Sequence, residues 1–149
     1  MGYLIEQALI KRETFIIDSG TVLGMDATTP HQLKKISGSY YIPIAANVTL
    51  DSNNYIGPYV GWTHLHLSLN NTTFAVPAII ATLAANSTIG TAMSRDYNYQ
   101  FQMNFQTSPN RFGSNIFTDA DLYIWWDTLP TSGSGDIYLD IYYVEQNFR

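Results

Sequence analysis

Two histidines separated by one residue are the first candidates for chemistry in this chain. His64 and His66 lie where leucines alternate with other residues, so a strand would project both imidazoles from the same face. Two imidazoles on one face can supply two of the ligands of a zinc or nickel ion. The third histidine, His31, is distant in sequence. Such a pair is more often a surface or interface feature, so we predict no metal site and assign both residues to a contact surface.

A second candidate group combines carboxylates with two adjacent tryptophans. Carboxylate oxygens suit hard cations such as calcium, and aromatic faces stack on pyranose rings. The group would therefore suit a calcium ion or a sugar. The alternative is a turn that holds aspartates, with one tryptophan in the core and its neighbour at an interface. The residues of this alternative ligand site are Asp119, Asp121, Trp125, Trp126 and Asp127.

The chain carries none of the common catalytic motifs. It has no Gly-x-Ser-x-Gly, Gly-x-x-x-x-Gly-Lys or His-Glu-x-x-His sequence, which mark hydrolases, phosphate-binding loops and zinc proteases. Its lack of cysteine excludes disulfides, thiolate zinc sites and a cysteine nucleophile. We therefore predict a non-enzymatic protein without a cofactor. A hydrolase assembled from scattered aspartates and histidines is the least favoured alternative.

Composition limits the partners that the protein can have. Among 149 residues, 7 are Lys or Arg and 12 are Asp or Glu, which gives a net charge of -5. Because binding to phosphates needs clustered basic residues, we expect no nucleic-acid partner. No apolar run approaches the roughly 20 residues of a membrane-spanning helix, and the first ten residues do not resemble a signal peptide. We therefore expect no membrane partner.

Alternating apolar and polar residues predict that these candidates stand on β-strands. Residues 97–106 place five apolar side chains on one face and five uncharged amides on the other. Residues 122–126 and 136–144, joined by a glycine-containing turn, predict a closing hairpin. Residues 78–85 fit a helix and a strand equally well. Further strands are predicted at residues 14–18, 21–25, 32–36, 40–50 and 62–69.

The spacing of the turns predicts the fold class. Turn signals recur about every 8–15 residues, which is typical of a β-sandwich and not of alternating strands and helices. We predict an all-β protein with a single antiparallel β-sandwich, jelly-roll-like, and a short N-terminal arm or helix. Residues 1–14 are assigned to the arm and residues 15–149 to the sandwich domain.

The outer faces of the predicted strands favour contact with other polypeptides. Tyr138 and Tyr142 share one face of the last strand, and tyrosine anchors protein contacts because it buries a large area. Amides can form hydrogen bonds to a partner without the desolvation cost of a charge. A monomer with an unusual polar surface is the alternative. The predicted contact residues are Leu4, Ile5, Leu9, Trp62, His64, His66, Tyr138 and Tyr142.

The order of the segments resembles small β-sandwich structural proteins of tailed bacteriophages. The likeness starts at residues 16–23, continues with a T-x-P-x-x-L segment at residues 28–33 and a long aliphatic strand at residues 35–44, and covers about residues 15–144. It implies a virion location as a head decoration, neck or collar, tail or fibre-anchoring component. It also implies that the protein is a homo-oligomer, with itself and other virion proteins as partners. A carbohydrate-binding module that uses Trp125 and Trp126 remains the alternative function.

Overall fold

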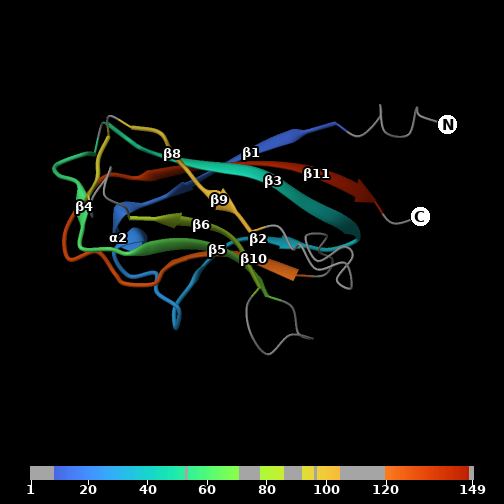
Figure 1. Cartoon of the computed structure of the whole chain (residues 1–149), viewed down its shortest axis with the longest axis horizontal. Coiled ribbons are helices and arrows are strands. Elements are labelled where there is room, and N and C mark those ends of the chain that lie inside the picture. The colour runs from blue at the N-terminus through green and yellow to red at the C-terminus, as the bar shows by residue number, and fades with distance from the viewer. Residues whose placement is uncertain are drawn as a thin grey trace.

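The computed structural model describes residues 9–52, 54–70, 78–85, 92–95, 97–104 and 120–147. Two antiparallel sheets pack face to face and enclose the core between them (Figure 1). The predicted all-β sandwich is therefore confirmed. Among the described residues, no helix is long and apolar enough to cross a membrane.

Each sheet is built from strands that are far apart in sequence. The first sheet has the order β1 (Lys11–Ile17), β11 (Ile137–Asn147), β3 (Ser39–Leu50) and β8 (Tyr99–Gln100). The second has the order β2 (His31–Ile36), β10 (Ala120–Trp126), β5 (His64–Asn70), β6 (Ala78–Ala84) and β9 (Gln102–Met103). A small third sheet pairs β4 (Tyr59–Val60) with β7 (Ala92–Met93), and one short helix, α2 (Ser19–Val22), follows β1.

The strand pairs are nested along the sequence. β1 pairs with β11, β2 with β10, β3 with β8, and β5 with β6. The chain thus has the topology of one long hairpin that is folded across two sheets. Pairing of β11 with β3 in the first sheet, and of β10 with β5 in the second, connects successive layers of this hairpin. This arrangement is a jelly roll, a rolled double sheet in which β1 remains the outer strand of the first sheet.

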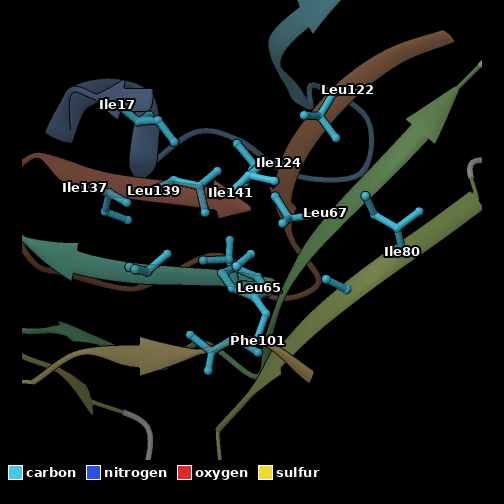
Figure 2. Close-up of a cluster of buried hydrophobic side chains, with 14 of the residues drawn as sticks. Ile17, Leu65, Leu67, Ile80, Phe101, Leu122, Ile124, Ile137, Leu139 and Ile141 are labelled. Carbon is cyan, nitrogen blue, oxygen red and sulfur yellow. The ribbon is translucent and has the colours of Figure 1, made fainter. Parts of the chain in front are cut away.

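The core forms where the inward faces of both sheets meet. Ile137, Leu139 and Ile141 alternate with half-buried residues on β11 and are at most 1% exposed. Figure 2 shows them opposite Leu67 and Ile124 from the second sheet. Burial of such a side chain stabilises the fold by about 1.5–3 kcal/mol. The predicted alternation along β11 is confirmed.

The predicted closing hairpin is wrong, because β10 and β11 lie in different sheets. The segment between them crosses one end of the sandwich and pairs there with the region of β4. Val60 N donates to Ser132 O at 3.1 Å, and Thr131 N donates to Val60 O at 2.8 Å. Because the segment after β10 pairs with the region of β4, the chain passes from the second sheet to the first. A tight turn would instead have placed β11 beside β10 in the same sheet.

The predicted strand at residues 21–25 is also wrong, since helix α2 occupies its first half. Asp18 is the N-cap of this helix, and its Oδ1 accepts a hydrogen bond from Thr21 N at 3.0 Å. A side chain that satisfies a free N–H of the first turn favours a helix start. Val22 and Met25 are then buried at the end of the core.

Two other predicted strands are interrupted. Residues 97–106 contribute β8 to the first sheet and β9 to the second, with Phe101 buried between them; residues 105 and 106 lie outside the described residues. In β3 a bulge lies at Ile44, where Tyr142 pairs with Ala45 and Tyr143 with Pro43. The bulge reverses the alternation of faces, so that Pro43 is buried with the core residues.

The start of the chain is described only in part. Residues 1–8, with the predicted contact residues Leu4 and Ile5, lie outside the described residues. β1 begins at Lys11, so the last four residues of the range assigned to the arm pair with β11. Residues 78–84, which fitted a helix and a strand equally well, form the strand β6.

Candidate functional site

The predicted histidine pair lies on the outer face of the second sheet. Leu65 and Leu67 on β5 point into the core and are fully buried, so the alternation of the strand places His64 and His66 on the opposite face. Their rings are nearly parallel, with centroids 5.7 Å apart and an angle of 9° between the planes. The predicted common face of the two imidazoles is therefore confirmed.

His66 is held in place from both sides along a row that crosses four strands. Trp125 on β10, Thr82 on β6 and Gln102 on β9 are in register with it. The Trp125 ring lies 4.6 Å from the imidazole centroid, and Thr82 Oγ1 is 2.9 Å from His66 Nδ1. Beyond Thr82 the face is hollowed by a space of about 310 Å³ lined by Thr82, Gln102, Met103 and Asn104.

This part of the outer face is shielded from solvent. His66 is 9% exposed and Ser68 is 1% exposed, although both point away from the core. Trp125 contacts both, since its Nε1 donates to Ser68 Oγ at 3.0 Å. Burial lowers the pKa of His66, and this effect outweighs Asp127, whose charge raises it. The imidazole is therefore neutral near pH 7.

Asp127 joins the two histidines. It directly follows β10, and its backbone N–H donates to His64 O at 2.9 Å, which continues the β10–β5 ladder. Its Oδ2 lies 3.4 Å from His64 Nδ1, and this buried nitrogen has no hydrogen-bond partner among the described residues. One ligand atom from each of the three residues lies within 4.8 Å of the others. We call this group the His64–His66–Asp127 cluster.

Sequence reasoning placed Asp127 with the tryptophans and not with the histidines. The residues are 61 to 63 positions apart (127 minus 66 and 127 minus 64), so only the register of β10 on β5 brings them together. Both segments have the composition of strands, but composition does not determine which strands pair or in which register. No signal within the single sequence reveals this contact.

Trp62 and Trp126 are core residues, which corrects two predictions. Both are 0% exposed, with rings 5.2 Å apart, and Trp126 Nε1 donates to Val22 O at 2.8 Å. Trp62 is therefore not a surface contact residue. β5 begins only at His64, so the alternation of that strand does not extend back to Trp62. Trp126 cannot stack on a sugar together with Trp125.

The two aspartates of the second candidate group that the structure describes are far apart. Asp121 and Asp127 lie at opposite ends of β10, about 20 Å apart along an extended strand. Asp119 lies outside the described residues. Of the two aspartates in the described part of the chain, only Asp127 belongs to a cluster with other ligand-bearing side chains, and its partners there are histidines.

The predicted contact residues lie on more than one surface. Tyr138 and Tyr142 are half-buried on the outer face of the first sheet, on the opposite side of the sandwich from the histidines. Tyr138 OH donates to Asp51 Oδ2 at 3.2 Å, and the charge of Asp51 raises the pKa of this tyrosine. Leu9 precedes β1 and is 70% exposed.

No family model, curated protein or solved structure matches this chain. The described residues form a jelly roll with an imidazole–carboxylate cluster on one outer face.

Proposed function

We propose that the protein is a non-enzymatic structural component of a bacteriophage virion that assembles as a homo-oligomer in the head, neck or tail. The observation that carries the proposal is the exposure of three apolar side chains along the β1 segment, Leu9 and Ile10 before the strand and Ile16 near its end, which are 70%, 65% and 64% exposed and which we call the apolar edge. β1 is the outer strand of the first sheet, and an edge strand offers unpaired backbone groups to a second chain. Apolar side chains beside that edge would gain stability by burial in a neighbouring subunit.

The jelly roll supports this proposal without establishing it, because the same fold also builds lectins and cupins. A closed ring or trimer would let every copy present the same apolar edge to its neighbour. The separation of Asp121 from Asp127 excludes these two residues as a glycosidase pair, which needs two carboxylates within about 5–10 Å.

Light scattering of the eluting protein tests the assembly. We expect the full chain to elute as an oligomer and the triple variant Leu9→Ser, Ile10→Ser, Ile16→Thr to elute as a monomer with unchanged circular dichroism. Ile56→Ser is the matched control, because Ile56 is 92% exposed but does not belong to the apolar edge. A monomeric wild-type protein at high concentration would contradict the proposal.

The virion location needs a separate observation. We expect portal and capsid genes beside the gene of this protein, and the protein itself in purified particles by mass spectrometry. Its absence from intact particles that contain the other products of those genes would contradict this part of the proposal.

A further inference from the structure

We propose that the His64–His66–Asp127 cluster is a binding site for a divalent transition-metal ion of the zinc class. The proposal does not depend on the function proposed above, because it rests on side chains of the second sheet alone. The site would use one imidazole nitrogen from each histidine and one carboxylate oxygen from Asp127.

The distance between the first two ligand atoms already fits such an ion. Zinc lies about 2.0–2.1 Å from nitrogen and oxygen ligands, so two ligands at the tetrahedral angle are about 3.3–3.4 Å apart. His64 Nδ1 and Asp127 Oδ2 are 3.4 Å apart and are not joined by a hydrogen bond. A buried nitrogen beside a carboxylate, with no hydrogen bond in the described structure, is a polar group that a cation between the two would satisfy.

Closure of the site requires only a small movement. The three ligand atoms lie within 4.8 Å of one another, so the widest pair must approach by up to about 1.5 Å to reach a tetrahedral edge. The side chains of His64 and Asp127 are 44% and 55% exposed, which leaves them room to rotate. His66 is the fixed member, held between Trp125 and Thr82.

Thr82 has the position of a residue that orients a metal ligand. Metal-binding histidines commonly donate their second ring N–H to an oxygen acceptor, which fixes the tautomer and the ring orientation. The Thr82 hydroxyl, 2.9 Å from His66 Nδ1, can accept that hydrogen bond and leave the Nε2 lone pair for the ion. Thr82 is therefore a positioning residue and not itself a ligand.

The donor set determines the class of ion. Imidazole nitrogens suit zinc, copper and nickel, whereas calcium and magnesium require oxygen ligands. Three protein ligands leave at least one coordination position for water or for a group from another molecule. We therefore expect Zn²⁺, Ni²⁺ and Cu²⁺ to bind and Ca²⁺ and Mg²⁺ not to bind.

Isothermal titration of the full chain with ZnCl₂ tests the proposal. We expect one ion per chain, and binding at least about tenfold weaker in His64→Ala and in Asp127→Asn, with a loss of about tenfold in Thr82→Val. Asp127→Asn keeps the size of an exposed side chain and should leave the fold intact, which thermal unfolding without metal verifies. Cu²⁺ should also quench the fluorescence of Trp125, and Trp125→Phe should remove that part of the signal.

Two control variants separate a built site from adventitious binding to surface groups. His31→Ala removes the third histidine, and Asp121→Asn removes a carboxylate from the other end of β10. Both should bind Zn²⁺ as tightly as the wild type. The proposal is overturned if the wild type binds no zinc, if Asp127→Asn binds zinc as tightly as the wild type, or if His31→Ala abolishes binding.

Discussion

At the scale of single residues, one buried indole joins three distant parts of the chain. Trp126 ends β10, its backbone N–H donates to Met25 O at 2.8 Å, and its indole N–H donates to Val22 O. Its ring packs against Trp62 at 5.2 Å and faces Tyr59 at 6.5 Å. These aromatic residues close one end of the sandwich and hold helix α2 against it.

Gly133 is required for the packing of this aromatic group. Its φ is +139°, and a Cβ at this position would lie 2.6 Å from Tyr59 Cα, a distance that only a shift of the backbone could relieve. We expect Gly133→Ala to lower the free energy of unfolding by at least about 1–3 kcal/mol, the usual cost of such a backbone conformation. Urea unfolding measures this loss.

The control for this prediction is Gly57→Ala. A Cβ at Gly57 meets no described atom within 4 Å, so the substitution should be close to neutral. Equal stability of the two variants would show that the close approach of Gly133 to Tyr59 is not a constraint on the fold.

Single residues also show where sequence reasoning fails. His64 and His66 could be assigned to one face, because alternation along a strand is a local property. Trp62 could not be assigned to the core, because it lies before the first residue of β5, where the alternation of that strand does not apply. Asp127 could not be paired with the histidines, because their contact depends on the register between two strands.

At the scale of elements, the connection from α2 to β2 is organised by one carboxylate. Asp26 Oδ1 accepts hydrogen bonds from the backbone N–H and the hydroxyl of both Thr28 and Thr29. These bonds, that to the Thr28 hydroxyl most strongly, lower the pKa of Asp26 from 3.8 to about 2. The bonds favour the charged form, so they stabilise the folded state where Asp26 is ionised.

The sign of the pH effect follows from this lowered pKa. Asp26 contributes stability above about pH 4, and the contribution is lost as the pH falls towards about 2, because the unfolded chain takes up the proton first. We expect the difference in urea midpoint between wild type and Asp26→Asn to shrink over this window. A difference that stays constant from pH 6 to the acid limit of folding would contradict the prediction.

The strands themselves were largely predictable, whereas their partners were not. Ile137, Leu139 and Ile141 alternate with polar or aromatic residues, and this pattern is sufficient to predict a strand with one buried face. The glycine-containing turn between β10 and β11 suggested a hairpin of the two strands, since neighbours in sequence commonly pair. The pairing of residues 131 and 132 with the region of β4 decides against it, and this contact is not local.

At the scale of the whole molecule, the last strand completes the first sheet. β11 pairs with β1 on one side and with β3 on the other. It also buries Ile137, Leu139 and Ile141, each contributing about 1.5–3 kcal/mol. Their sum is comparable with the total stability of an ordinary domain, about 5–15 kcal/mol.

We therefore expect a chain that ends at Gly135 to show no cooperative thermal unfolding by circular dichroism. A chain that ends at Asn147 retains all of β11 and is the matched control, which should unfold as the wild type does. Addition of a peptide of residues 137–147 to the shorter chain should restore a transition. A cooperative transition in the shorter chain by itself would contradict the assigned role of β11.

The nested pairing also has a consequence for synthesis on the ribosome. Thr14 on β1 donates a hydrogen bond to Asp140 on β11, which lies 126 residues later. At about 5–20 residues per second, β1 waits roughly 6–25 s for its partner strand to be translated. During that interval the nascent polypeptide displays Phe15 and Ile17, which pack into the core of the folded protein, beside an unpaired backbone, so polysomes that make this protein are expected to recruit holdase chaperones to the emerging β1.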